Sequence, residues 1–92
     1  MSVQWLFDVI QDRKENPSEG SYTSSLFAEG LSKIAQKVGE EASEVIVAAL
    51  AQNDQRLIEE VADLTYHTLV LLAARDLSLA DVQAELEQRH KK

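Results

Sequence analysis

With 92 residues, of which 45% are hydrophobic, the chain has enough material for one small domain and too little for a second catalytic domain. It contains no cysteine, which excludes structural disulfides and thiolate metal sites. Its 16 acidic and 9 basic residues give a net charge of −7, so nucleic acid is disfavoured as a partner and a phosphate-bearing substrate would require bridging cations.

The first predicted element is an amphipathic helix that runs from Ser2, a candidate N-cap, to about Glu15. The segment Asn16–Ser25 contains the only proline together with several serines, and it predicts a loop. We expect this loop to close at Thr23 or Ser24, since either residue can cap the helix that follows.

The second predicted element is one long or slightly broken helix over Leu26–Gln52. Its apolar residues keep a spacing of three and four, interrupted only by Gly30 and Gly39. Asn53 then offers a turn and an N-cap for a third helix, in which the same spacing continues to about Arg75.

The last predicted element is a short helix that begins at Ser78, which has capping-box spacing with Asp81, and ends near Arg89. The longest apolar run, Leu69–Ala74, is too short to cross a bilayer, and no leader segment is evident, so a cytoplasmic protein without a membrane partner is expected. No segment predicts a strand. We therefore expect an all-α, four-helix bundle-like fold in which residues 1–92 form a single domain.

The third predicted helix is apolar over more of its circumference than one core requires. Val70 lies opposite Val61 and Leu72 on the helical wheel, and Leu71 lies between these faces. A second apolar face predicts a homodimer. The alternative is that the first and fourth helices cover this face within one chain.

Two acidic clusters lie inside the second and third predicted helices. One pairs Glu41 with Glu44, and the other pairs Glu60 with Asp63. Because the members of each pair are three residues apart, a helix points both carboxylates to the same side. The pairs are predicted to flank apolar stripes centred on Leu31, Val38, Ala42 and Ala49 and on Val61, Thr68 and Leu72. If the two helices pack antiparallel, four carboxylates converge.

Converging carboxylates repel one another unless a cation neutralises them. With oxygen ligands alone, such a site selects Mg²⁺ or Mn²⁺ over zinc, and Mg²⁺ commonly binds a phosphate-bearing substrate as well. The alternative is that both clusters are solvated helix faces, stabilised by ion pairs such as Lys37 with Glu41.

The motif Glu-Glu-x-x-Glu, followed after fifteen residues by Glu-x-x-Asp, resembles the signature of the all-α nucleoside triphosphate pyrophosphatases, the MazG-like superfamily. The wider sequence is similar to one family within it, the phosphoribosyl-ATP pyrophosphatases. That likeness covers nearly the whole chain and includes Ser21-Tyr22-Thr23-Ser24-Ser25-Leu26, Gly30, Lys33-Ile34-Ala35-Gln36-Lys37-Val38-Gly39-Glu40-Glu41 and Ala62-Asp63-Leu64-Thr65-Tyr66-His67.

The resemblance implies a helical homodimer that hydrolyses phosphoribosyl-ATP to phosphoribosyl-AMP and pyrophosphate with Mg²⁺, the second step of histidine biosynthesis. Many relatives carry a fused cyclohydrolase domain, which we do not expect here because the chain is short and lacks cysteine. Two alternatives remain open. One is a housecleaning nucleotide pyrophosphatase that acts on free nucleotides, and the other is a non-catalytic acidic helical module that binds a protein.

Matching the motif assigns four expected metal ligands, which are Glu41, Glu44, Glu60 and Asp63. Glu41 is therefore also a candidate catalytic residue. Glu40 is a second catalytic candidate, as a ligand of a further ion or as the acceptor of a proton from the attacking water. The alternative for Glu40 is an exposed helix carboxylate.

Basic and hydroxyl side chains are the expected substrate contacts. Lys33 and Lys37 can bind phosphate oxygens, or they can form salt bridges within their own helix. Thr23 and Ser24 stand where free backbone N–H groups at a helix start suit an anion, a role compatible with N-capping.

Three further residues are candidate substrate contacts, and Arg13 and Tyr22 each have an alternative role. Arg13 can reach a phosphate or the ribose, or remain solvated. Tyr22 can stack on the base or pack in the core. His67, one turn after Asp63, is placed to contact a metal ligand or the substrate, and direct metal ligation is not expected in a site of oxygen ligands.

Overall fold

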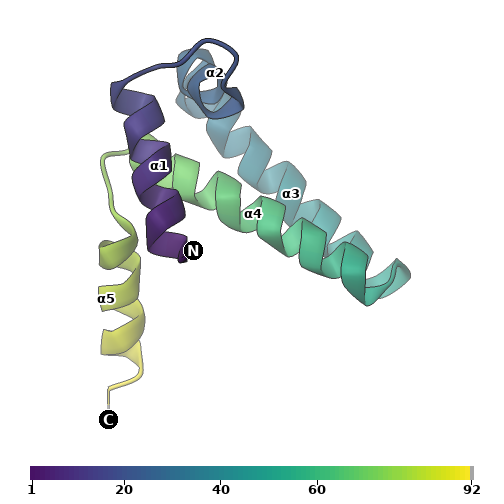
Figure 1. Ribbon diagram of the computed structural model, residues 1–92. Helices are drawn as coiled ribbons and strands as arrows, with labels where there is room; N and C mark the ends of the chain where they lie inside the picture. The colour runs from purple at the N-terminus through teal and green to yellow at the C-terminus, as the bar shows by residue number, and fades with distance from the viewer. Residues whose placement is uncertain (92) are drawn as a thin grey trace.

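The computed structural model describes residues 1–91, and within them every regular element is a helix (Figure 1). The five helices are α1 (Val3–Glu15), α2 (Tyr22–Glu29), α3 (Leu31–Ala51), α4 (Asp54–Ala74) and α5 (Leu79–Arg89). The predicted all-α class is confirmed. Across residues 1–91, none of these helices combines the length and apolarity that a bilayer crossing demands.

Three helix starts lie where the sequence predicts them. Ser2 caps α1 by accepting a hydrogen bond from the Trp5 backbone N–H at 3.1 Å. Asn53 caps α4 in the same way. A reciprocal capping box joins Ser78 and Asp81 at the start of α5. In each case a short polar side chain satisfies a backbone donor that the helix itself leaves free.

The predicted cap of α2 is wrong. The N-cap is Ser21, whose hydroxyl accepts from the Ser24 N–H at 3.1 Å, so the helix begins before Thr23. The Ser24 hydroxyl is engaged elsewhere, because it accepts from the Ser18 N–H at 3.0 Å and ties the preceding loop to the helix. Several hydroxyl residues in succession can each cap a helix, and spacing alone does not choose among them.

The long helix expected from residue 26 onward is broken at Gly30 into α2 and α3. Gly30 has φ 96° and ψ 174°, a conformation that is essentially restricted to glycine. Gly39, the other predicted interruption, lies inside α3 without breaking it. The break turns the chain, so that α2 folds against α3 instead of prolonging it.

Alanine substitution at the two glycines should therefore have opposite effects on stability. Gly30→Ala is expected to lower the free energy of unfolding by about 1–3 kcal/mol, because alanine is strained at this positive φ. Gly39→Ala should raise it by roughly 0.5–1 kcal/mol, since alanine favours the helix and no atom lies within 4 Å of the added Cβ. Urea denaturation of both variants measures the difference. Equal destabilisation would contradict this account of the break.

The core lies at one end of a long antiparallel pair formed by α3 and α4, where α1 packs on α4 and α2 packs on α3 (Figure 1). The buried residues of this core are Phe7, Ile10, Leu26, Ile34, Leu69, Val70 and Ala73. The other end of the pair, near the Asn53 turn, projects beyond α1 and α2, and α5 leads away from the body of the molecule. Only part of the α3–α4 pair is thus covered by other helices.

The interface between α3 and α4 differs from the predicted stripes. On α3, Ile34, Glu41 and Ala48 are buried, and Leu31, at the centre of the predicted stripe, is 45% exposed. On α4, Glu60 and His67 are among the buried residues. Glu41 and Glu60 therefore lie within the buried interface, whereas Glu44 and Asp63 are exposed at its flank.

The second apolar face of α4 stays open to solvent. Val70 is fully buried, but Val61, on the opposite side of the helix, is 44% exposed and Ile58 is 62% exposed. Near the tip of the pair, Leu50 of α3 is 84% exposed. Within residues 1–91, α1 covers the Val70 side of α4 and leaves Val61 and Ile58 exposed, so the same chain covers the apolar surface of this helix only in part.

Candidate metal centre

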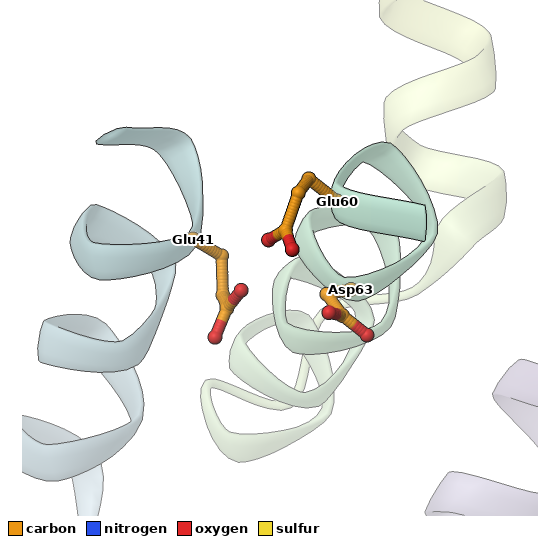
Figure 2. A group of neighbouring side chains, drawn as sticks. All are labelled: Glu41, Glu60 and Asp63. Atoms are coloured by element: carbon orange, nitrogen blue, oxygen red, sulfur yellow. The ribbon is translucent and has the colours of Figure 1, made fainter. Parts of the chain in front are cut away.

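Three carboxylates converge across the α3–α4 interface. Glu41 projects from α3, and Glu60 and Asp63 project from adjacent turns of α4 (Figure 2). One oxygen from each side chain lies within 4.8 Å of the other two. The antiparallel packing predicted from the short Asn53 turn brings these residues together.

Two of these carboxylates are nearly inaccessible to water. Glu41 is 7% exposed and Glu60 is 5% exposed, and the Oε2 atom of each has no hydrogen-bond partner. A buried carboxylate oxygen without a partner is costly, and like charges at this separation add repulsion. A hard divalent cation would relieve both costs, and the all-oxygen donor set fits such an ion.

Each buried glutamate also has a basic neighbour on its own helix. The Lys37 Nζ lies 3.6 Å from Glu41 Oε1 and 3.3 Å from Glu40 Oε2. On α4, the Arg56 guanidinium donates to both Glu59 and Glu60. These contacts neutralise part of the acidic cluster and leave the two Oε2 atoms free.

Hydrogen bonds from Gln36 and then Lys37 hold the pKa of the Glu40 carboxyl below its usual value. The bond to Glu40 in turn raises the pKa of Lys37. Glu40 is exposed and paired, so it is an ionised salt-bridge partner of Lys37 in this structure. The predicted salt-bridge alternative for Lys37 is thereby observed.

Arg56 was not among the predicted site residues, although it shares the polar flank of α4 with Glu60. The available signal was its position four residues before Glu60, which repeats the placement of Lys37 before Glu41. Glu44, a predicted fourth ligand, is exposed and supplies no oxygen to the observed group.

The start of α2 is joined to the acidic cluster through His67. The His67 Nδ1 lies 2.8 Å from the Asp63 carbonyl oxygen and must donate to it, so in the neutral ring Nε2 accepts from the Tyr22 hydroxyl at 3.1 Å. His67 is buried, whereas Tyr22 is 53% exposed with its ring near those of Tyr66 and His67. His67 thus contacts Asp63, a candidate metal ligand, through the Asp63 backbone.

The other residues predicted near this helix start are engaged with protein groups. The Thr23 hydroxyl bonds the Tyr66 hydroxyl, and the Ser24 hydroxyl, besides its loop contact, donates to the Arg13 carbonyl at 3.4 Å. The Arg13 side chain pairs with Asp12 at 2.8 Å. The Thr23 and Ser24 bonds fix α2 against α4 and α1, the Arg13 pair lies within α1, and none of the three joins the acidic cluster directly.

Burial raises the pKa of Tyr66, against a smaller lowering by its bond to Thr23. The folded protein therefore retains this proton more strongly than the unfolded chain, whose phenol titrates near pH 10. The stabilisation is complete below that pH and is lost as pH rises through the folded pKa. We expect the melting temperature to fall more steeply above pH 10 in the parent than in Tyr66→Phe, measured by circular dichroism. Identical slopes for the parent and Tyr66→Phe would refute the assignment.

A hollow of the surface lies away from the acidic cluster. A cavity of about 420 Å³ is lined by Lys14, Pro17, Ser24, Phe27, Ala28, Leu31, Ile34 and Ala74. Its lining is mainly apolar and shares no residue with the acidic cluster. Charge and unsatisfied oxygens, not concavity, distinguish the candidate site.

The sequence also matches known proteins over nearly its full length. Residues 3–90 match the family described as phosphoribosyl-ATP pyrophosphohydrolase. A phosphoribosyl-ATP pyrophosphatase of Listeria welshimeri is 60% identical over 87 residues, which cover 95% of this chain and 84% of the relative. A relative of the same description from Clostridium botulinum is 52% identical over 90 residues, covering 98% of this chain and 82% of the relative.

Proposed function

Because the chain belongs to the phosphoribosyl-ATP pyrophosphohydrolase family, we propose that its acidic cluster is the centre at which phosphoribosyl-ATP is hydrolysed. The enzyme converts this substrate and water to phosphoribosyl-AMP and pyrophosphate, a step of histidine biosynthesis. The observation that carries the site is the pair of buried Oε2 atoms of Glu41 and Glu60, which lack any partner. We expect the reaction to take place in the cytoplasm.

A pyrophosphohydrolase of this family is expected to require a divalent metal, and we propose Mg²⁺, with Mn²⁺ as a substitute. Glu41, Glu60 and Asp63 would hold it, and Glu44, from the next turn of α3, stays a predicted additional ligand. The bound cation would polarise the phosphoanhydride and neutralise its non-bridging oxygens.

The chain's own residues would bind and orient the polyphosphate. Lys37, beside Glu41, is placed to contact phosphate oxygens, and Lys33, one turn earlier on α3, extends the same basic row. The Tyr22–His67 bond would hold the start of α2 next to Asp63, so that Thr23 and Ser24 keep a fixed position relative to the cluster. Glu40 stays a predicted proton acceptor, but its bonds to Lys37 and Gln36 favour a role in holding Lys37.

We also propose that a second copy of the chain covers the exposed apolar face of α3 and α4. Val61, Ile58 and Leu50 are large apolar residues left open in one chain, and a domain of this size gains stability by burying them. Light scattering at micromolar concentration should give twice the mass of one chain. A monomeric mass would contradict the dimer without affecting the metal centre.

Release of pyrophosphate from authentic phosphoribosyl-ATP, with and without a chelator, tests the proposed centre. Activity should require added Mg²⁺ and disappear on chelation. Free nucleoside triphosphates in the same assay separate this enzyme from a housecleaning pyrophosphatase, which would turn them over faster. Thermal melting with added Mg²⁺ tests the remaining alternative, because a non-catalytic module should melt at an unchanged temperature up to millimolar Mg²⁺.

A further inference from the structure

The two halves of the acidic cluster repeat one local pattern. On α3 the sequence is Lys37-Val38-Gly39-Glu40-Glu41, and on α4 it is Arg56-Leu57-Ile58-Glu59-Glu60. In both, a basic residue contacts an exposed glutamate three residues on and a buried glutamate four residues on. The buried member of each pair belongs to the candidate metal centre, and the exposed member does not.

Each basic side chain therefore bridges two carboxylates of unequal burial. The side chain of Glu60 is 6% exposed and that of Glu59 is 45% exposed, with Arg56 between them at 44%. On α3 the corresponding values are 9% for Glu41, 47% for Glu40 and 24% for Lys37. Since Lys37 and Arg56 already touch the exposed glutamates, either can leave its buried partner by a small side-chain movement.

A cation that binds Glu41 and Glu60 meets positive charge at both. Lys37 and Arg56 partly neutralise the carboxylates that it would use, and like charges in so small a space repel by amounts worth several-fold in affinity. If the basic side chains have another anion within reach, that repulsion is relieved. Glu40 and Glu59 are the nearest such anions.

From these contacts we infer that Lys37 and Arg56 are built-in counter-ions of the proposed metal centre, and that Glu40 and Glu59 receive them when a divalent cation binds. The inference rests on the proposed metal centre and adds a role for residues outside the ligand set. Glu40 and Glu59 are thereby positioning residues, which act on the cation through their basic neighbours. The exchange also leaves two cationic groups beside the cation, where phosphate oxygens of the substrate would lie.

Mn²⁺ binding to the purified protein, measured by isothermal titration calorimetry at about 0.15 M salt to screen distant charges, tests this exchange. Arg56→Gln should bind Mn²⁺ about three- to tenfold more tightly than the parent, because the competing cation is gone. Glu59→Gln should bind it several-fold more weakly, because Arg56 then stays on Glu60. In the double variant the Glu59→Gln penalty should vanish, since no guanidinium remains to be received.

The double-variant comparison separates exchange from the general effect of charge. If Glu59→Gln weakens Mn²⁺ binding equally with and without Arg56, the two residues act independently and the inference is overturned. If Arg56→Gln binds Mn²⁺ no more tightly, Arg56 is not a competing counter-ion. A parent protein that binds no Mn²⁺ would instead refute the metal centre itself.

The chain supplies a matched control and a second test. Arg89 and Glu85 form an exposed pair four residues apart on α5, with 3.1 Å between Nε and Oε2, so Arg89→Gln and Glu85→Gln should leave Mn²⁺ affinity unchanged. The cycle of Lys37→Gln with Glu40→Gln repeats the experiment on α3 and keeps the inference testable if an Arg56 variant folds poorly. Circular dichroism without metal confirms that each variant is folded.

Discussion

Glu60→Gln is expected to lower the rate of pyrophosphate release by about 10²- to 10³-fold, on the order of the loss when one preorganised electrostatic group is removed from an active site. Glu60 belongs to the cluster and has a buried oxygen without a partner. The amide keeps the size of the side chain but carries no negative charge, so a cation would lose one of its ligands. A continuous pyrophosphate assay measures the rate.

The same substitution should cost little stability in the absence of metal. It replaces a buried carboxylate by a neutral group of similar volume and relieves the repulsion with Glu41, while the half-exposed Arg56 keeps its pair with Glu59. The rise in melting temperature that we expect for the parent on addition of Mg²⁺ should be absent in Glu60→Gln. Glu85→Gln on α5 is the control and should retain both activity and the Mg²⁺ effect. If Glu60→Gln keeps the activity of the parent, the proposed location of the metal centre is wrong.

Phe7→Ala should have the largest effect on stability, a loss of roughly 3–5 kcal/mol in the free energy of unfolding. The Phe7 ring is 1% exposed and packs in the core where α1 meets the start of the α3–α4 pair. A domain of this length has about 5–14 kcal/mol in total at the usual stability per residue. A large part of the free energy of unfolding therefore depends on the Phe7 side chain.

Trp5→Ala is the matched control, because Trp5 lies on the same helix and is 52% exposed. Its substitution should cost far less than that of Phe7. Urea denaturation of both variants gives the comparison, and added Mg²⁺ should partly restore the midpoint of Phe7→Ala if the metal binds only the folded protein. Equal losses for the two aromatic residues would mean that the face of α1 that holds Trp5 is also buried, which a dimer covering α1 would explain.

The sequence was sufficient to locate most helix ends and three carboxylates that the structure brings together. Caps such as Ser2, Asn53 and Ser78 act on donors two or three residues away, so their effect is local and can be read from neighbouring residues. The carboxylate pairs are also local, since three-residue spacing fixes a common direction on any helix. The place of the helix break was not predictable from glycine alone, because Gly39 lies inside α3 whereas Gly30 interrupts the helix.

The orientation of the helices about their own axes was not predictable from the spacing of apolar residues. Both predicted stripes, around Leu31 and around Val61, are apolar enough to form a core, and yet those residues are about half exposed. The face that is buried in the α3–α4 pair contains Glu41, Glu60 and His67. Hydrophobic periodicity finds the most apolar face of each helix, but it does not say whether that face meets the same chain or another copy.

By itself, the sequence determined that this protein is all-α, that it carries paired carboxylates suited to a divalent cation, and which family it resembles. These properties depend on residue type and short spacing. Only the tertiary structure decided that Glu41 and Glu60 lie buried with unsatisfied oxygens, that Glu44 lies outside the cluster, and that basic residues bridge buried and exposed glutamates. The physical reason is that burial and charge pairing depend on how two helices rotate against each other, which no spacing within one helix can fix.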